Sequence, residues 1–375
     1  MRLSFVEVNR VLLVTVTALL SVFRLSLGAQ ETELVRFSRD TGSLRIAVAG
    51  MVHGHVEGLL HAAGQRDDLQ IVGVYEPNRE LYRRLAEKYD LDSSLRYDSL
   101  DRMLEGAKPE VVSGMTSIRD HVQIVEACAP RGVHVFLEKP LAYSLADARR
   151  MAELAKKHRT LVLTNYETSW YESVREAERI LMTKDAPAIR RMVFRHGHSG
   201  PREIGCAPEF LEWLTDPEEN GGGALVDFGC YGVVLASWLM KGERPLEIQV
   251  SAHQTKPETY LEVDDDSTII LRYPGVVAVV QGSWAWTHDL KEMDVYTDSF
   301  SLHAGRWDLL TKRVANGEPE RLNPQPMLDV LRDEWTYLKE VVRGKTAVDE
   351  LSSLELNLTV VSILDEARRQ VASSL

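Results

Sequence analysis

The stretch Leu44-Arg-Ile-Ala-Val-Ala-Gly50 decides the fold of this chain. It is a short apolar run that ends in glycine, which is typical of a buried strand entering a tight turn. Residues that suit a helix follow, and a second strand-like run ends at Glu76. Strand, glycine turn, helix, strand and a terminal acid about 25 residues after the glycine form the layout of a dinucleotide-binding βαβ unit. The acid would hold an adenosine ribose hydroxyl.

The turn after this strand departs from the usual glycine fingerprint. Gly50 would let the backbone approach a pyrophosphate at the helix N-terminus. The pattern G-x-G-x-x-G would also need glycine two and five places further on, but the chain has Val52 and His55 there, with Gly54 one place early. We expect His53 and His55 near the phosphates, and the alternative is that both are surface residues of the loop.

A second apolar run ends in charged residues, in the segment Val133-His-Val-Phe-Leu-Glu-Lys-Pro-Leu141. Ligands of open α/β sheets bind just beyond the carboxyl ends of the strands. Burying charged residues at such a place costs free energy, whereas the same residues are useful in a ligand site. Pro140 would stop the strand and stiffen the backbone of Lys139. We therefore expect Glu138 and Lys139 to lie at a ligand site.

Composition describes an ordinary globular protein. The chain has 375 residues, of which 44% are hydrophobic and 27% charged, a length of about two or three usual domains. The net charge of −12 argues against nucleic acid and anionic membrane surfaces as partners. The three cysteines form no zinc pattern, and nothing in the sequence fixes carboxylate partners for His196 and His198, so we expect no metal.

The N-terminus has the pattern of an export signal. Residues 11–23 are uncharged and mostly apolar, and small residues follow at 28–29. The run is too short for a membrane span and suits a signal-peptide core. We expect residues 1–29 to be a signal peptide and the protein to be periplasmic or secreted, with no stable membrane insertion after its removal. The alternatives are an uncleaved membrane anchor and a misassigned start.

Two kinds of hydrophobic pattern divide the rest of the chain. Alternating strand-like and helix-like runs over 44–165 predict a doubly wound, mostly parallel sheet. The strand-like runs are 44–49, 71–75, 111–114, 134–137 and 160–163, and the helix-like runs include 80–89, 121–129 and 145–158. Residues 166–375 predict an α+β domain with a large open, mostly antiparallel sheet. Its strand-like runs are 190–197, 246–252, 267–273, 276–284, 294–296 and 300–303, with helices at 173–182, 327–342 and 352–372.

A glycine loop entering a helix forms the second constellation, in Gly221-Gly-Gly-Ala-Leu-Val-Asp227-Phe-Gly229-Cys-Tyr231 and the residues that follow. Asp227 and Tyr231 are four residues apart and would share one helix face. Several glycines in one helix indicate the close approach of another backbone or of a ligand. The alternative is tight helix packing, with Tyr231 half buried.

With these pieces in order, the chain resembles the Gfo/Idh/MocA family, named for glucose–fructose oxidoreductase and inositol dehydrogenase. The Ser117-Ile-Arg-Asp-His121 segment also stands where the family carries a similar loop. The resemblance covers roughly residues 44–372. It implies an N-terminal Rossmann domain at 44–165 and a C-terminal substrate and oligomerisation domain at 166–375. It also implies NAD(H) or NADP(H) as the cofactor, either exchanging or tightly bound.

The resemblance also implies residue roles. Lys139 is the family's catalytic lysine, Tyr231 would be the acid/base, and Asp227 would orient Tyr231 or hold a substrate hydroxyl. Lys139 would lower the pKa of Tyr231. Trp170 and Tyr171 would stack on a sugar, or else belong to the domain junction. The expected cofactor-binding residues are Gly50, Val52, His53, Gly54, His55, Glu76, Ser117, His121, Glu138 and Lys139.

The implied function is oxidation of a sugar, polyol or glycoside hydroxyl by hydride transfer. Glu76 favours NAD over NADP, because a carboxylate repels a 2′-phosphate. One alternative keeps the same site and recycles a tightly bound cofactor in glycoside cleavage. Another is a non-catalytic nucleotide- or sugar-binding protein, which the missing glycines favour. A homo-oligomer is expected at the level of the family.

Overall fold

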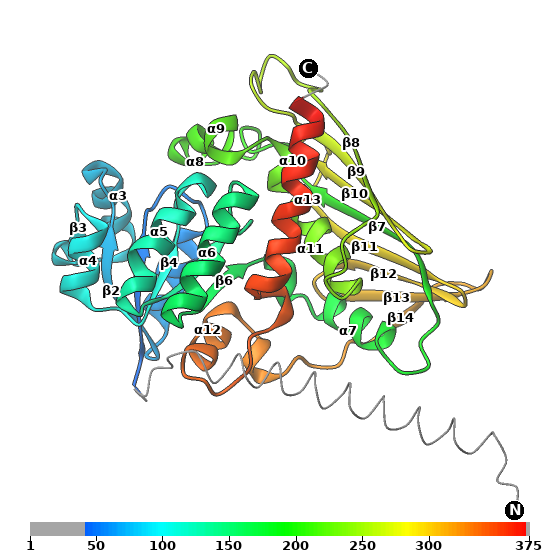
Figure 1. Ribbon diagram of the computed structural model, residues 1–375, viewed down its shortest axis with the longest axis horizontal. Coiled ribbons are helices and arrows are strands. Elements are labelled where there is room, and N and C mark those ends of the chain that lie inside the picture. The colour runs from blue at the N-terminus through cyan, green and yellow to red at the C-terminus, as the bar shows by residue number, and fades with distance from the viewer. Residues whose placement is uncertain (1–41, 373–375) are drawn as a thin grey trace, which may run out of the picture. The chain divides into compact units, whose positions relative to one another are not determined.

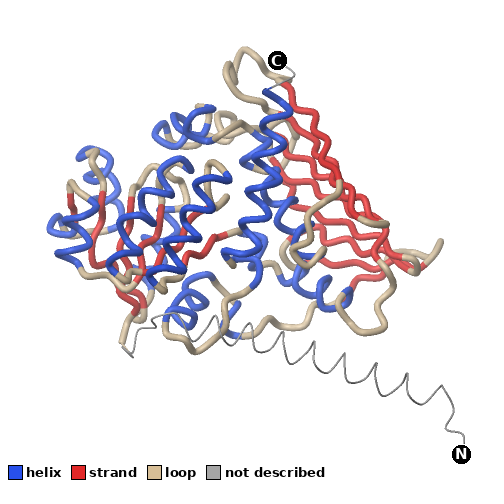
Figure 2. The backbone as a smooth tube through the Cα atoms, in the orientation of Figure 1, coloured by secondary structure: helices blue, strands red, loops and turns tan. Residues whose placement is uncertain are grey.

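The computed structural model describes residues 42–372, and the predicted signal peptide lies outside these residues. Two sheets organise the described chain, with helices on both faces of the first and on one face of the second (Figures 1 and 2). This confirms the predicted fold class. The first sheet has the strand order β3-β2-β1-β4-β5-β6, and the second has β14-β13-β12-β11-β7-β10-β9-β8.

Every strand pair of the first sheet is parallel. Its strands are β1 (Leu44–Ala49), β2 (Leu69–Tyr75), β3 (Arg96–Tyr97), β4 (Val111–Gly114), β5 (His134–Glu138) and β6 (Val162–Asn165). Its helices are α2 (Val56–Gln65), α3 (Arg79–Tyr89), α4 (Leu100–Ala107), α5 (His121–Cys128) and α6 (Leu145–His158). β4 and β5 are wholly buried, as expected for parallel strands covered on both faces. The strand order reverses between β1 and β4, where ligands of such sheets bind.

The second sheet is antiparallel except where β7 pairs with β10. Its strands are β7 (Ile189–Gly197), β8 (Glu247–His253), β9 (Asp266–Tyr273), β10 (Val276–Ser283), β11 (Leu290–Thr297), β12 (Phe300–Arg306), β13 (Leu309–Val314) and β14 (Glu320–Leu322). Buried and half-buried residues alternate along β9, so one face is covered. Helices α11 (Gly229–Leu239) and α13 (Leu354–Ala372) cover it (Figure 1).

The predicted helix after the glycine loop is broken. Its residues form α10 (Ala224–Asp227) and α11, with Phe228 between them. The backbone of β10 crosses this junction so closely that a Cβ on Gly282 would lie 2.7 Å from Gly229 N. A Cβ on Gly232 would likewise lie 2.5 Å from a methyl carbon of Val280. Gly232 and Gly282 therefore serve the close packing of helix on sheet, which was one of the predicted alternatives.

The remaining helices are α7 (Glu172–Leu181), α8 (Pro208–Leu214), α9 (Pro217–Asn220) and α12 (Glu334–Val342). The predicted helix 327–342 begins only at Glu334, because the Asp333 side chain accepts hydrogen bonds from Trp335 N and Thr336 N and caps the helix there. Strands β3, β13 and β14 were not predicted. They are short or have no clear alternation of buried and exposed residues.

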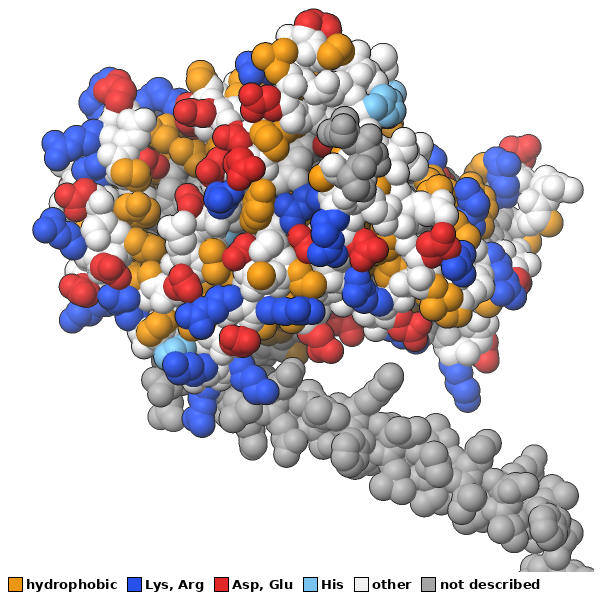
Figure 3. All heavy atoms as spheres, turned by 45° about the horizontal axis from the view of Figure 1, so that its top comes forward, with side chains coloured by type: hydrophobic (Ala, Val, Ile, Leu, Met, Phe, Trp, Pro, Cys, Tyr) orange, Lys and Arg blue, Asp and Glu red, His pale blue; other side chains and the backbone are white. Residues whose placement is uncertain are grey.

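Helix α12 packs against the first sheet although it belongs to the last part of the chain. The rings of Trp335 and Phe136 lie 6.0 Å apart, and Arg66 donates to Asp333 at 2.8 Å and to Thr336 at 2.9 Å. Acidic and basic side chains are interspersed on the face shown in Figure 3. Within residues 42–372 no single helix has the length and apolar composition to cross a membrane. Two segments bent by 61°, Pro217–Asp227 and Gly229–Leu239, meet those criteria together.

Candidate active site

Strand β5 carries two charged side chains to the carboxyl edge of the first sheet. Glu138 is its last residue and Lys139 follows. Because β4 and β6 flank the strand, its carboxyl end is where a ligand can approach. Glu138 is 3% exposed and Lys139 is 7% exposed. Each buried charge therefore needs a partner to remain ionised.

The partner of Lys139 is Asp227, at the end of α10. Lys139 Nζ donates to Asp227 Oδ1 at 2.5 Å and to the Asp227 carbonyl oxygen at 2.9 Å. Trp284 Nε1 donates to the other carboxylate oxygen at 2.9 Å. Burial opposes both charges, but the mutual attraction raises the pKa of Lys139 and lowers that of Asp227. The site thus holds an ammonium beside a carboxylate at neutral pH.

Tyr231 lies beside this pair with its ring buried. Lys139 Nζ is 5.1 Å from the ring centroid, and Lys291 Nζ is 5.8 Å from it. Burial, followed by the negative charge of Glu167, raises the pKa of Tyr231 well above its ordinary value. The prediction of a lowered pKa for Tyr231 is therefore wrong, because burial and the surrounding negative groups outweigh the ammonium of Lys139. Tyr231 is therefore a neutral phenol near neutral pH.

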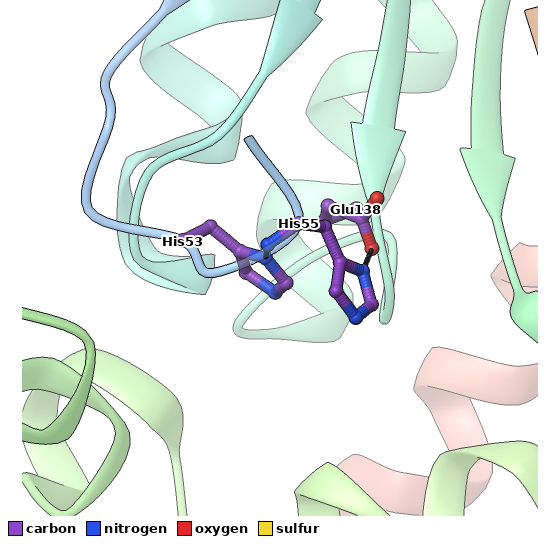
Figure 4. Close-up of side chains that lie close together, drawn as sticks. All are labelled: His53, His55 and Glu138. Carbon is purple, nitrogen blue, oxygen red and sulfur yellow. Dashed lines mark hydrogen bonds and ion pairs between the residues drawn. The ribbon is translucent and has the colours of Figure 1, made fainter. Parts of the chain in front are cut away.

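Two histidines and a carboxylate meet beside the turn that follows β1. Figure 4 shows His53 and His55 on the loop before α2, with His55 directed at Glu138 at the end of β5. His55 Nδ1 lies 2.9 Å from Glu138 Oε2, and Asn165 donates to the other oxygen at 3.1 Å. Burial opposes each charge, yet the pair raises the pKa of His55 and holds that of Glu138 far below its usual range. His53 is 2% exposed, and burial keeps its pKa well below the ordinary value.

The turn itself retains features of a nucleotide cradle. Gly50 has a φ of +79°, and a Cβ there would lie 2.6 Å from Thr116 Cγ2, so only glycine fits. Glu76 is 2% exposed and accepts hydrogen bonds from Met51 N and Asn78 N, each at 2.8 Å. The predicted acid is thus held next to the glycine turn. At Gly54, in contrast, a Cβ would meet no other atom within 4 Å, so the space there is open.

Three other predicted cofactor residues lie close to this turn or to Glu138 and Lys139. Val52 O accepts from Trp213 Nε1 at 3.4 Å. His121 is buried, with Nδ1 3.1 Å from Leu141 O, and its Nε2 has no hydrogen-bond partner in the described chain. The Ser117 hydroxyl donates to Glu219 of α9 at 2.7 Å, so this side chain is engaged with that helix.

The two predicted substrate residues, Trp170 and Tyr171, are hydrogen-bonded to polar side chains beside the site. Trp170 Nε1 donates to Asn165 at 3.0 Å, which links the indole to the amide that binds Glu138. The Tyr171 hydroxyl donates to Glu167 at 2.5 Å, and Lys291 donates to the same carboxylate at 2.7 Å. Both aromatic side chains are partly exposed. They border the site, although their hydroxyl and indole groups already have partners.

Comparison with known proteins now identifies the architecture. Residues 44–166 match the family described as "Oxidoreductase family, NAD-binding Rossmann fold", and residues 174–303 match the Gfo/Idh/MocA C-terminal domain. The chain belongs to the Gfo/Idh/MocA family. The predicted resemblance and the predicted NAD-type cofactor are therefore confirmed. In this family member, the Gly50 turn lies within the NAD-binding part.

Individual relatives are distant. Trans-1,2-dihydrobenzene-1,2-diol dehydrogenase of Xenopus tropicalis is 26% identical over 210 residues, which cover 56% of this chain and 58% of that protein, less than two thirds of its length. The Homo sapiens protein of the same name is 26% identical over 330 residues, covering 82% and 90%. The crystal structure of aldose-aldose oxidoreductase from Caulobacter crescentus complexed with glycerol is 19% identical. It has a TM-score of 0.73 and covers 89% of this chain and 98% of that one.

Several residues of this Gfo/Idh/MocA site were not identified from the sequence. They are Asn165, Glu167, Trp284, Lys291 and His196, whose ring lies 5.7 Å from that of Tyr231. Trp284 and Lys291 lie at the ends of strands of the second sheet, and nothing in their local pattern marks them. Asn165 ends β6, so its place at the carboxyl edge of a predicted parallel strand was the one available signal.

Proposed function

We propose that the protein is an NAD(P)-dependent oxidoreductase that acts on a CH–OH group of a sugar, polyol or glycoside. The observation that carries this proposal is the buried Lys139–Asp227 pair at the carboxyl end of β5. It presents an ammonium beside an NAD-type turn, where an oxygen that gains or loses charge needs stabilisation. The names of the relatives, a diol dehydrogenase and an aldose-aldose oxidoreductase, support the same substrate class.

The residues of the turn fit a dinucleotide. The positive φ of Gly50 lets the chain turn tightly at the end of β1. The Glu76 carboxylate lies at the end of β2, and an adenosine ribose is bound at that position in such folds. We propose that Glu76 favours NAD, because its negative charge opposes a 2′-phosphate. When bound, the nicotinamide supplies hydride transfer at the substrate carbon. This chain's own groups then have to manage the substrate oxygen and its proton.

Lys139 and Tyr231 divide that work. The ammonium of Lys139, kept charged by Asp227, donates a hydrogen bond to the substrate oxygen and stabilises negative charge on it. Tyr231, a neutral phenol, gives a proton to a carbonyl oxygen during reduction and accepts it back during oxidation. Because its pKa is raised, phenolate is scarce near neutral pH and reduction is the easier direction there. Trp170 and Tyr171 would border the substrate.

The first test is mass spectrometry of any small molecule released when the purified protein is denatured. Stoichiometric NAD(H) or NADP(H) supports the proposal and identifies the cofactor. A substrate screen with sugars, polyols and glycosides follows, with Lys139→Met expected to abolish turnover while nucleotide remains bound. Glycoside cleavage without net reduction of added NAD would instead support the recycled-cofactor alternative. No released nucleotide and no binding on addition would favour a non-catalytic protein.

We make two further proposals, which concern the export of the protein and its oligomeric state. The apolar run at 11–23 supports export of the protein to the periplasm or beyond the cell, which mass measurement of the mature chain from cell fractions would test. The open second sheet supports a homo-oligomer. Light scattering coupled to size-exclusion chromatography would measure its mass, and a monomer at micromolar concentration would remove that proposal.

A further inference from the structure

The cluster of His53, His55 and Glu138 has the composition of a metal site. One ligand atom from each of the three lies within 4.8 Å of the others. The two imidazoles come from one loop, with ring centroids 4.7 Å apart, and the carboxylate comes from the end of β5 (Figure 4). Two histidines and one glutamate form a known ligand set for zinc, in sites that keep a further position open. The sequence led us to expect no metal, so this cluster is a finding of the structure.

Two of the three ligands, His55 and Glu138, already lie close to coordination geometry. Ligand atoms about 2.0–2.1 Å from a tetrahedral metal are about 3.3 Å from one another. His55 Nδ1 and Glu138 Oε2, now 2.9 Å apart, would separate by about 0.4 Å. His53 Nδ1 accepts a 3.2 Å hydrogen bond from His55 N, so a metal would either replace this bond at Nδ1 or bind Nε2 after a change of tautomer. Because Nδ1 accepts, the His53 ring is neutral, which is the form that binds metals.

The surroundings hold two of the three ligands firmly and leave one accessible. His53 N donates to Met115 O at 3.1 Å, and its ring packs 5.5 Å from that of Trp213. Glu138 is fixed by β5 and by the hydrogen bond from Asn165. The His55 side chain is 49% exposed, compared with 3% for Glu138. A cation bound here would be open to water or to a ligand on the His55 side.

The charges near the cluster permit a cation. Lys139 is a positive group that acts on both histidines, but Asp227 balances its charge. Glu167 adds a further negative charge that acts on His55. Imidazole with carboxylate suits zinc and its first-row neighbours, whereas magnesium and calcium prefer oxygen ligands alone. The cluster therefore selects for a transition metal.

We propose that His53, His55 and Glu138 bind one divalent first-row transition-metal ion of the zinc class, with at least one coordination position open. If the proposed function holds, this position faces the nucleotide turn, and the cation would supply positive charge to a pyrophosphate where glycines are replaced by Val52 and His55. Metal binding itself does not depend on that function, so the two can fail separately.

The test is titration of the full chain, without a histidine tag and stripped by a chelator, with Zn²⁺ alone in a calorimeter and with Co²⁺ alone in a spectrometer. We expect one ion per chain and a Co²⁺ d–d spectrum of a four- or five-coordinate site. His55→Asn should weaken binding by more than the roughly 10–100-fold that outer-shell changes cause. Because His55 is half exposed, this variant is the one whose fold should be least disturbed, and Glu138→Gln is the second variant.

His61→Asn is the matched control, since His61 is an exposed histidine on α2 of the same segment. It should bind Zn²⁺ with unchanged affinity and stoichiometry. Binding weaker than millimolar in the parent chain would overturn the proposal, as would stoichiometric binding that survives in both His55→Asn and Glu138→Gln. Nucleotide retention is measured separately, with and without Zn²⁺. Metal binding without any nucleotide binding would keep this inference and remove the proposed function.

Discussion

Replacing Asp227 by asparagine should destabilise the protein strongly, because it leaves the buried ammonium of Lys139 without its counter-charge. The two side chains are 8% and 7% exposed, and Lys139 Nζ donates two hydrogen bonds to Asp227. Removing one partner of such a pair costs about 3–5 kcal/mol. The cost of deprotonation sets the same upper limit. Removing the proton from a lysine with an ordinary pKa of about 10.4 costs about 5 kcal/mol at pH 7. We therefore expect Asp227→Asn to lower the free energy of unfolding by about 3–5 kcal/mol.

The measurement is urea denaturation at pH 7 without added nucleotide, followed by far-UV circular dichroism and by tryptophan fluorescence, so that a transition with more than one step is detected. Lys139→Met and the double variant complete a thermodynamic cycle. The double variant should be more stable than either single variant, since it leaves no buried charge unpaired. Asp298→Asn is the control, because the Arg190–Asp298 pair is exposed and should contribute little to the free energy of unfolding. A loss below about 1 kcal/mol for Asp227→Asn, or a double variant as unstable as the summed singles, would refute the reasoning.

Three other outcomes follow from the structure. Turnover in the oxidation direction should rise about tenfold per pH unit between pH 7 and 9, since the raised pKa of Tyr231 makes phenolate the scarce form. In steady-state assays, Tyr231→Phe should remove this pH dependence. Burial lowers the pKa of His196 to about 3, below its unfolded value, so its contribution to stability is complete above about pH 6.5 and is lost as pH falls toward 3. Denaturation curves of His196→Phe should lack that part of the pH dependence, and an unchanged slope would contradict the assignment. Gly232→Ala should cost about 1–3 kcal/mol in thermal or urea unfolding, because its Cβ would lie 2.5 Å from Val280 Cγ1. Gly64→Ala, with open space around it in α2, should instead be neutral or stabilise by up to about 1 kcal/mol.

The main features of the fold and half of the site could be predicted because they depend on local pattern. Apolar runs that end in glycine or in charge identify buried parallel strands, and the ends of such strands meet at one edge of the sheet. This reasoning places Glu138 and Lys139 at the carboxyl edge, as the structure has them. The family resemblance placed Asp227 in the same site as Lys139, but the pairing of the two side chains, 88 residues apart, was not predicted.

The remaining features depend on packing that no local pattern shows. The helix break at Phe228 follows from the backbone of β10 at Gly282, far along the chain. The raised pKa of Tyr231 follows from its burial and from Glu167, neither of which periodicity shows. The contact between His55 and Glu138 depends on the path of the loop that follows β1. The presence of histidine at position 55, where the fingerprint has glycine, does not specify that path.

Helix α12 has a consequence for how the chain is made. Its Trp335 covers Phe136 of β5, and Asp333 binds Arg66 beside α2. During synthesis the first sheet leaves the ribosome long before this helix does, so the surface around Phe136 stays uncovered while the second sheet is translated. A fragment that stops near residue 165 would expose that apolar surface permanently. Expression of the nucleotide-binding part alone should therefore yield aggregating material, and adding residues 333–343 through a linker should restore its solubility.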